Sequence, residues 1–336
     1  MTDLDLSSIA LPAGAAPVAC VDIGGTKVAV CVTDSNGMRG QVVEPTVREG
    51  NSGALADQLL RMLEHSAASA KIQLKTIAAV GISSCGPFVM NQGAVELAAP
   101  NICGGLAGPA RGLPNDWTSA PLEAPLREHF AHVRVENDGI ASLEAERRWG
   151  ALRKDGVALA HCAYVTWSTG IGVGLCVDGH VLRGKNGNAG HAGHIFVSSG
   201  IDTLCGCGNV GDVESLVAGN ALPRRFAHLG YADANALMTA ASQQDATAME
   251  IVDGLCEVMG RMLFGLVATL DLQRISLGGS VYWHHRDLLL PKLQQCVQAK
   301  LPPLTQACDI VSAGLGQRVG DFAALALVSS KSVNFI

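Results

Sequence analysis

The sequence contains few aromatic residues and no cluster of basic residues. Phe, Trp and Tyr make up only 4% of the 336 residues, whereas hydrophobic residues make up 48% and glycine occurs 39 times. Small aliphatic side chains with many glycines favour buried strands joined by tight turns, as in α/β enzymes. The formal net charge is −6 and Lys and Arg form no run, so the electrostatic signature of nucleic-acid-binding proteins is missing. We therefore expect no nucleic acid among the partners of this protein.

The sequence also lacks the marks of secretion and of membrane insertion. Asp3 and Asp5 stand where a secretory signal would carry positive charge, and the apolar stretch that follows is short and broken by proline. Residues 156–177 contain no Lys, Arg, Asp or Glu and are long enough to mimic a membrane span. Polar residues and glycines between 168 and 174 would interrupt such a helix, whereas two buried strands joined by a polar glycine turn explain the same segment. We expect a cytoplasmic protein that does not bind membranes.

The chain contains eleven cysteines, an odd number that does not suit a framework of disulfides. Most of them, for example Cys20, Cys162 and Cys176, lie in apolar strand-like segments. We expect these to be reduced thiols in the core. Cys205 and Cys207 differ because they lie in a glycine-rich turn.

The chain length and the order of the expected elements predict two domains. Single hydrophobic cores usually stop growing below this length. Strand-like and helix-like segments alternate, which favours two mixed α/β lobes with a cleft between them. For example, leucines at 55, 59, 60 and 63 predict a helix over residues 54–70. We place a small lobe at residues 16–136 plus 317–336 and a large lobe at residues 137–316.

Three glycine-rich turns adjoin strand-like segments and are candidates for binding a nucleotide. Their sequences are DIGGTK at 22–27, STGIGVG at 168–174 and LGGSV at 277–281. Glycines in such turns let backbone N–H groups approach phosphate oxygens without interference from a Cβ atom. In the first turn, Thr26 can donate a hydroxyl hydrogen bond and Asp22 could hold water on a Mg²⁺ ion. Each turn alone is equally compatible with an ordinary tight hairpin, and the P-loop pattern GxxxxGK[ST] is absent.

Asp138 is the candidate catalytic base. The pair Asn137 and Asp138 lies where the strand-like segment VRVEND ends and a helix-like segment begins. A carboxylate there can project into a cleft and accept a proton from a substrate hydroxyl. An ordinary helix N-cap would use the same residues, but the three glycine-rich turns elsewhere in the chain favour the catalytic role.

A group of His, Cys and Asp residues predicts a metal site. The CGCG sequence brings Cys205 and Cys207 close together, and His194 before it and Asp212 after it can complete a tetrahedral shell. We expect a structural zinc ion at this site. The alternative is a glycine-rich turn with two incidental cysteines.

Together these segments resemble the ROK family, which includes bacterial glucokinases and N-acetylmannosamine kinases. The resemblance runs from about Cys20 to about Val328 and rests on the joint order of the motifs. The matching segments are DIGGTK at 22–27, ENDG at 136–139, STGIGVG at 168–174, AGHAGH at 189–194, CGCGNVG at 205–211, Glu214, and LGGSV at 277–281.

The resemblance implies a two-lobed actin-like ATPase (ribonuclease H-like) fold with the active site in the cleft between the lobes. ATP and Mg²⁺ would bind there, and Asp138 would act as base toward a sugar hydroxyl, usually that on C6. Phosphoryl transfer depends mainly on positioning and charge stabilisation. A homodimer is implied as well. The residues implied to bind ATP are Asp22, Gly24, Gly25, Thr26, Lys27, Thr169, Gly170, Gly278 and Gly279. Those implied to contact the sugar are Asn137, Asp138, His194 and Glu214, with His194 also binding the zinc that fixes the sugar pocket.

His191 departs from the family pattern at a position that bears on the substrate. The family usually has glutamate in its AGEIGH-like stretch, where this chain has His191. A carboxylate that accepts twice is thereby replaced by an imidazole with one donor and at most one acceptor when neutral. We expect His191 to contact the sugar and to favour a modified glucose, for example an amino sugar such as kanosamine. Plain glucose with altered hydrogen bonding and a tolerated substitution are the alternatives.

Three further departures concern the metal site and two loops. Asp212 stands where the family usually supplies a third cysteine, so zinc should be bound more weakly, with His191 as an alternative ligand. Ser168 replaces the usual glycine of the second phosphate turn. The loop over residues 102–116 is longer than is typical and could act as a lid on the substrate.

Two other functions compete with catalysis. A transcriptional repressor of this family would carry an N-terminal winged helix, and fewer than about twenty residues before the first glycine turn are too few for such a domain. A non-catalytic sugar-sensing regulator or scaffold is the second alternative, but the retention of Asp22, Asn137 and Asp138 favours an enzyme. The sequence therefore predicts ATP-dependent phosphorylation of a hexose hydroxyl, most simply the 6-OH of glucose or of an amino glucose.

Overall fold

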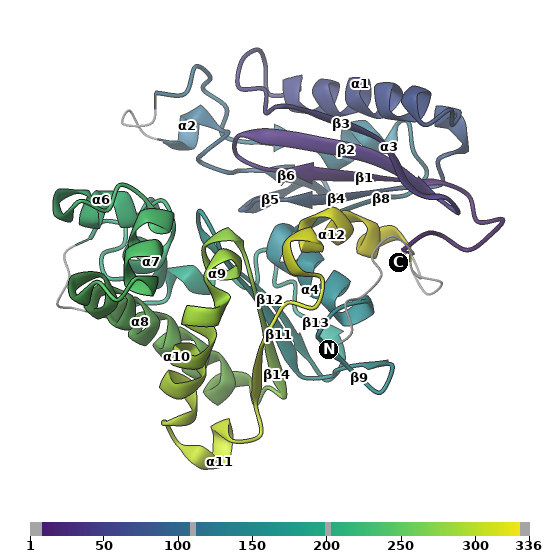
Figure 1. Ribbon diagram of the computed structural model, residues 1–336. Helices are drawn as coiled ribbons and strands as arrows, with labels where there is room; N and C mark the ends of the chain where they lie inside the picture. Colours follow the sequence, from purple (N-terminus) through teal and green to yellow (C-terminus); the bar gives the residue numbers. More distant parts are fainter. Residues whose placement is uncertain (1–8, 108–111, 199–202, 330–336) are drawn as a thin grey trace. The chain divides into compact units, whose positions relative to one another are not determined.

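The structure, a computed structural model, describes residues 9–107, 112–198 and 203–329 (Figure 1). The first part of the N-terminal leader, the middle of the suggested lid loop and the end of the expected small lobe lie outside the described residues. The chain forms two compact units. The first comprises Met1–Ala145, Arg183–Asn188 and Gly320–Ile336, and the second comprises Glu146–Leu182 and Ala189–Val319.

The boundary between the units differs from the one expected after residue 136, because residues 137–145 belong to the first unit. The physical reason is helix packing. Helix α4 (Asp138–Arg148) contributes Ala141 to a small apolar cluster with Ala323 and Leu327 of α12 (Val319–Val328). The chain therefore passes from one unit to the other within α4 rather than before it.

The first unit is built on a five-stranded sheet with the order β3-β2-β1-β4-β8. Strands β1, β2 and β3 are antiparallel neighbours, whereas β4 and β8 continue the sheet in parallel with β1. The strands are β1 (Val18–Ile23), β2 (Lys27–Asp34), β3 (Gly37–Pro45), β4 (Ala79–Ser84) and β8 (Val133–Asn137).

The second unit repeats this arrangement in a sheet with the order β13-β12-β11-β14-β15. Again the first three strands are antiparallel, and the last two run parallel to β11. The strands are β11 (Cys162–Trp167), β12 (Ile171–Val177), β13 (His180–Val181), β14 (Arg274–Gly278) and β15 (Asp309–Ser312). Both units thus carry the same sheet, as expected of duplicated lobes.

Two small sheets complete the strand inventory of the described residues. One has the order β5-β6-β7 and the other pairs β9 with β10. These strands are β5 (Phe88–Asn91), β6 (Ala94–Leu97), β7 (Ala120–Pro121), β9 (Arg153–Lys154) and β10 (Val157–Ala158).

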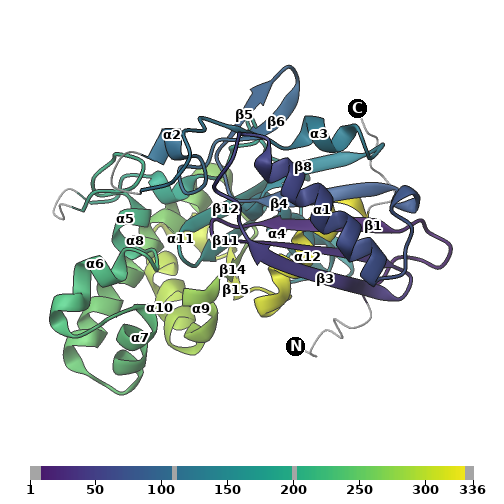
Figure 2. The ribbon, with the colours of Figure 1, turned by 90° about the horizontal axis from the view of Figure 1, so that it is seen from above.

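Helices cover both faces of the first sheet. Helix α1 lies along one face, whereas α12 and the start of α4 lie on the other (Figures 1 and 2). The leucines that predict a helix over 54–70 face the core: Leu55, Leu59 and Leu63 are fully buried. The remaining helical elements of this unit are short. The elements are α1 (Ala54–Ser69), η2 (Leu74–Thr76), α2 (Gly104–Ala107) and α3 (Glu123–Arg127).

The core of the second unit forms around its longest helix, α8, whose buried side chains join those of α10 and of the sheet. Asp245 caps the start of α8, because its side chain accepts a hydrogen bond from the Ala248 N–H at 2.7 Å. The helical elements are η4 (Ala192–His194), α5 (Val213–Val217), α6 (Leu222–Phe226), η5 (Ala227–Leu229), α7 (Ala234–Ser242), α8 (Ala246–Leu270), α9 (Ser280–His284), α10 (Arg286–Gln298), α11 (Pro302–Thr305) and η6 (Gly316–Arg318).

The uncharged segment 156–177 forms strands, as predicted: it contains β10, β11 and β12, and the turn at 168–170 joins the last two. Within the described parts of the chain, no helix is both long and apolar enough to cross a membrane. All eleven cysteines are free thiols, and most are buried.

Glu146 is a fully buried carboxylate that ties three segments of the second unit together. One oxygen, Oε2, accepts hydrogen bonds from Ala151 N–H at 2.7 Å, Gly314 N–H at 2.9 Å and the Ser276 hydroxyl at 3.1 Å. The other, Oε1, accepts from Leu315 N–H at 2.8 Å. Four donors offset the cost of burying this polar group. The contact fixes the end of α4 to the middle of β14 and to the chain after β15.

Candidate active site and metal centre

Asp22, Asn137 and Asp138 come together because they lie at the carboxyl ends of parallel strands of one sheet, β1 and β8, which flank β4. Asp22 is paired in register with Ser83 of β4, and Asn137 with Ser84 of the same strand. The carboxyl ends of β1, β4 and β8 therefore meet at one edge of the first sheet, the edge where ligands bind in open α/β sheets. The structure brings the predicted base and the predicted magnesium-associated carboxylate to the same edge.

Asn137 and Asp138 also serve the start of α4. The Gly139 N–H donates to Asn137 Oδ1 at 3.0 Å and to Asp138 Oδ1 at 2.8 Å. The capping role considered as an alternative is therefore present in the structure. It is compatible with catalysis, because it holds the half-buried Asp138 carboxylate in place at the sheet edge.

The electrostatics of this edge are unusual. Burial and the negative charge of Asp138 raise the pKa of Asp22 to about 6, although a hydrogen bond with Ser83 and the charge of Lys27 oppose the rise. Asp321 of α12 raises the pKa of Asp22 further. Perturbed carboxylates of this kind cluster at functional sites. Asp321 lies in no sequence motif and reaches this edge only through the packing of α12, so its influence on Asp22 was not predicted.

The first glycine turn joins β1 to β2 and is held by its own backbone and by the segment after β3. The Gly24 N–H donates to Lys27 O at 2.9 Å, and the Thr46 hydroxyl donates to Gly24 O at 2.7 Å. Thr26 and Lys27 are exposed. A Cβ atom on Gly25 would force the side-chain amide of Asn101 to move. The turn thus keeps two exposed polar side chains next to Asp22.

The second and third glycine turns lie side by side in the second unit. Strands β11 and β14 are parallel neighbours, and Thr166 is paired in register with Gly278. The next residues are in close contact: a Cβ atom on Gly279, whose φ is +91°, would collide with the carbonyl oxygen of Trp167. The end of β11, which leads into Thr169 and Gly170, therefore lies against Gly278 and Gly279.

Glu214 and the two predicted histidines flank the second turn. Glu214 Oε2 accepts a hydrogen bond from the Ile171 N–H at 3.0 Å, directly after Gly170. The rings of His191 and His194 are stacked with their centroids 6.2 Å apart, and the intervening Gly193 packs against Ile171 and Glu214. The structure thus collects all three predicted sugar contacts of the second unit beside this turn.

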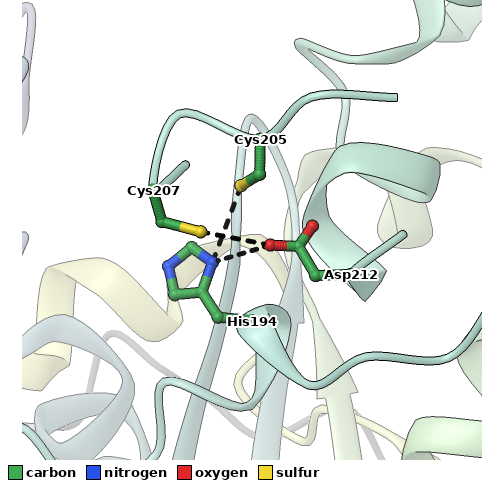
Figure 3. Close-up of side chains that lie close together, drawn as sticks. All are labelled: His194, Cys205, Cys207 and Asp212. Carbon is green, nitrogen blue, oxygen red and sulfur yellow. Dashed lines mark hydrogen bonds and ion pairs between the residues drawn. The ribbon is translucent and has the colours of Figure 1, made fainter. Parts of the chain in front are cut away.

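His194, Cys205, Cys207 and Asp212 form a compact cluster (Figure 3). The histidine comes from η4, the two cysteines from the CGCG turn, and Asp212 from the residue before α5. Their ligand atoms all lie within 4.8 Å of one another. The distances are 3.3 Å from His194 Nδ1 to Asp212 Oδ2, 3.7 Å from Cys205 Sγ to His194 Nδ1, and 3.3 Å from Cys207 Sγ to Asp212 Oδ2.

The three hydrogen-bonding distances within the cluster fit a zinc ion, and the other ligand atoms lie within 4.8 Å of one another. With zinc bonds of 2.0–2.3 Å, the donors of a tetrahedral site are separated by about 3.3–3.8 Å. One nitrogen, two sulfurs and one carboxylate oxygen form a donor set that zinc accepts. Burial raises the pKa of the Cys205 thiol, as does its contact with Asp212, although a hydrogen bond from the Cys207 backbone opposes the rise. A bound cation would oppose this effect by stabilising the thiolate.

Asp212 has a second role, which the sequence did not reveal. It is fully buried, and its Oδ1 accepts a hydrogen bond from the Ser215 N–H at 2.8 Å at the start of α5. Burial raises the pKa of Asp212, but hydrogen bonds with Ser215, Cys205 and Cys207 together outweigh it, so the pKa lies below its ordinary value. His191, considered as an alternative ligand, is not among the clustered residues.

The profile of the ROK family matches residues 18–331. The chain belongs to the ROK family. It is 28% identical to a glucokinase of Aeropyrum pernix, over 93% of this chain and 96% of that protein. It is 31% identical to an N-acetylmannosamine kinase of Salmonella paratyphi B, over 78% of this chain and 82% of that protein. A crystal structure of a ROK family glucokinase from Streptomyces griseus, in complex with glucose and AMPPNP, has a TM-score of 0.69 and 25% identity, and the match covers 94% of this chain and 100% of that chain.

These similarities confirm two of the predictions. The chain has the actin-like ATPase fold of the ROK sugar kinases, with a mixed α/β sheet in each unit. It is an enzyme of the sugar kinase class, which transfers a phosphoryl group to an alcohol.

Proposed function

We propose that this ROK kinase phosphorylates the 6-OH of glucose or of a modified glucose with ATP, and that Asp138 is the catalytic base. The observation that carries the proposal is the position of Asp138 at the end of β8, at the sheet edge that also holds Asp22. A carboxylate fixed by Gly139 can accept the proton of a sugar hydroxyl as that oxygen attacks the γ-phosphorus. Asp22, when ionised, would hold water on the Mg²⁺ ion that accompanies ATP.

The nucleotide would be held by backbone groups of the three glycine turns. In the first unit, the turn at Gly24 and Gly25 presents the exposed Thr26 and Lys27. In the second, Thr169, Gly170, Gly278 and Gly279 form adjoining turns. Bare backbone N–H groups and a nearby ammonium group suit the negatively charged oxygens of a triphosphate.

The residues that would bind the sugar hydroxyls are Asn137, Asp138, His191, His194 and Glu214. Histidine at 191, where a carboxylate is usual, alters the set of donors and acceptors that meet the sugar. An amino glucose such as kanosamine and glucose itself are the two substrates that this set favours. Both carry a primary alcohol on C6, so the role of Asp138 is the same for either.

Zinc at the His194, Cys205, Cys207 and Asp212 cluster would fix the sugar pocket rather than take part in the chemistry. His194 turns its Nδ1 toward Asp212 and Cys205. With the metal on Nδ1, a neutral imidazole carries its proton on Nε2, where it can donate to a sugar hydroxyl. We also propose a homodimer acting in the cytoplasm, which rests on the family resemblance alone.

The test is ADP production with a panel of hexoses and amino hexoses, comparing the wild type with Asp138→Asn. Asparagine keeps the Oδ1 that Gly139 needs but is no base, so we expect turnover of at least one sugar and a loss of at least 100-fold in the variant. Asp287→Asn, which removes an exposed carboxylate of the second unit, serves as the control and should be unchanged. Equal rates in wild type and Asp138→Asn would exclude the proposed base. Sugar binding without turnover by the wild type would favour a sugar-sensing protein.

A further inference from the structure

Two serine hydroxyl groups connect the second and third glycine turns. The last register pair between β11 and β14 joins Thr166 to Gly278, and two residues further along each chain lie Ser168 and Ser280. Their Oγ atoms are 2.9 Å apart, a hydrogen-bonding distance. The link thus spans from the second turn to the third turn.

The backbones on either side hold both serines in place. The Ser168 N–H donates to Gly170 O at 3.0 Å, and its carbonyl accepts from Gly219 N–H at 2.8 Å. Ser280 follows Gly279, which fits against Trp167 only because it has no Cβ atom. The hydroxyl pair is therefore built on two turns that already touch, rather than on two mobile surface chains.

The chemistry of the pair suits a phosphate ligand. Two hydroxyl groups that bond to each other use one of their two hydrogens, and the second hydrogen remains for an outside acceptor. The pair is solvent-exposed, so a ligand can reach it. Phosphate oxygens are acceptors, and the neighbouring backbone at Thr169, Gly170 and Gly279 is the part of this unit to which we assign the nucleotide.

We propose that Ser168 and Ser280 form a further part of the nucleotide site, as positioning residues. Their hydrogen bond holds the two turns at the spacing that a bound nucleotide needs, and the remaining hydroxyl hydrogen is donated to a phosphate oxygen. This inference rests on the proposed function. It is particular to this chain, because Ser168 occupies a position where the family resemblance leads one to expect glycine, which has no hydroxyl.

The second turn also contacts Glu214, one of the residues proposed to bind the sugar. The test must therefore distinguish loss of the hydroxyl pair from a general loosening of the turn. Glu214 accepts from the Ile171 N–H at the other end of the turn. A change that merely loosened the turn would therefore affect the sugar as well as the nucleotide. Loss of the hydroxyl pair alone should affect the nucleotide selectively.

The experiment is a double-mutant cycle with Ser168→Ala, Ser280→Ala and the double variant. Each protein is assayed for KM toward MgATP, for KM toward the sugar, and for the Kd of a fluorescent ATP analogue measured without sugar. Losing one hydrogen bond corresponds to about a two- to tenfold effect. We expect each single variant to raise the KM for MgATP and the Kd by that factor, with the KM for the sugar changed less than twofold. The double variant should be no worse than the weaker-binding single variant, because the two hydroxyls act as one unit.

Two further variants serve as controls for the hydroxyl pair. Ser242→Ala removes a hydroxyl that bonds to Met238 O within α7 of the same unit and should leave all three constants unchanged. Ser168→Gly, which restores the residue usual in the family, should behave as Ser168→Ala. Three outcomes would each overturn the inference while leaving the kinase proposal intact. The KM for MgATP and the Kd could be unchanged in both single variants, or the effects of the two substitutions could multiply in the double variant. The KM for the sugar could also rise as much as the KM for MgATP. A wild type that neither binds the analogue nor turns over ATP would overturn both.

Discussion

Asp22 and Asp138 lie at the ends of two strands of one sheet, and burial together with the charge of Asp138 raises the pKa of Asp22 to about 6. Two carboxylates at one edge repel each other when both are ionised. A bound Mg²⁺ ion would relieve that repulsion. Without Mg²⁺, keeping the two carboxylates at one edge lowers the stability of the folded protein.

The first prediction follows from this arrangement. The pKa of Asp22 in the folded protein, about 6, lies above that of an unfolded aspartate, so the folded state binds more protons and loses stability as the pH rises from about 4 to about 6. Asparagine does not ionise, so Asp22→Asn should not lose this stability as the pH rises. We expect the variant to be more stable than the wild type by roughly 3 kcal/mol at pH 7.5 without Mg²⁺, with the difference nearly vanishing by pH 4.

Urea unfolding at both pH values measures the effect. Asp57→Asn, at an exposed site in the first turn of α1, is the control and should change the unfolding free energy by less than about 0.5 kcal/mol. A variant that is less stable than the wild type at pH 7.5 would show that Asp22 is a favourable charge.

The second prediction concerns zinc. Protein purified without chelator should contain about one zinc ion per chain by elemental analysis, and this zinc should be removable by EDTA because a carboxylate replaces a thiolate. Asp212→Asn retains an oxygen that can cap α5 through Ser215 but lacks the charge, so it should lose zinc at a lower chelator concentration. Asp212→Cys should retain zinc more strongly, although it loses the cap at a cost of about 1 kcal/mol. Metal-free wild-type protein would rule out the four-ligand site.

The third prediction concerns sugar selectivity at His191. Replacing imidazole by carboxylate in His191→Glu restores two acceptors at this position. We expect the ratio of kcat/KM for glucose to that for an amino glucose to change at least tenfold, the effect of about 1.4 kcal/mol. His180→Glu, at an exposed position in β13, is the matched control. An unchanged ratio in His191→Glu would mean that the substitution is merely tolerated.

The fourth prediction concerns Glu146. Glu146→Ala leaves three backbone N–H groups and one hydroxyl buried without their acceptor, so we expect the unfolding free energy to fall by about 3 kcal/mol or more. Glu146→Gln keeps an oxygen for the three contacts of Oε2 and turns its amide group toward Leu315. Its free energy of unfolding should therefore fall by less than that of Glu146→Ala. Glu250→Ala, at an exposed position in α8, should differ little from the wild type. A similar small loss in Glu146→Ala would show that water replaces the carboxylate.

Local motifs allowed much of each unit to be predicted. The helix expected over 54–70 is α1 (Ala54–Ser69), because leucines at helical spacing place one buried stripe on the sheet. The strands on either side of 168–170 were predicted because a buried strand and a glycine turn leave clear signals in sequence. The grouping of His194, Cys205, Cys207 and Asp212 was predicted, since the two cysteines are separated by only one position and the other two residues lie nearby in the chain.

Other features escaped prediction because their partners are distant in sequence. Asp321 reaches Asp22 only because α12 packs on the sheet of the first unit. Glu146 gathers donors from segments more than a hundred residues away. The unit boundary also lies within α4, where the helix pattern continues without interruption.

The sequence by itself determined which groups are candidates for chemistry: the three glycine turns, the carboxylate of Asp138, and the His, Cys and Asp residues proposed to hold zinc. These depend on residue type and short spacing, which the chain carries from the start. Only the tertiary structure decided which of these groups meet, how their charges shift one another, and that Ser168 bonds to Ser280. Those outcomes depend on which strands become neighbours in the folded sheets, and that is determined by the packing of whole units rather than by any single segment.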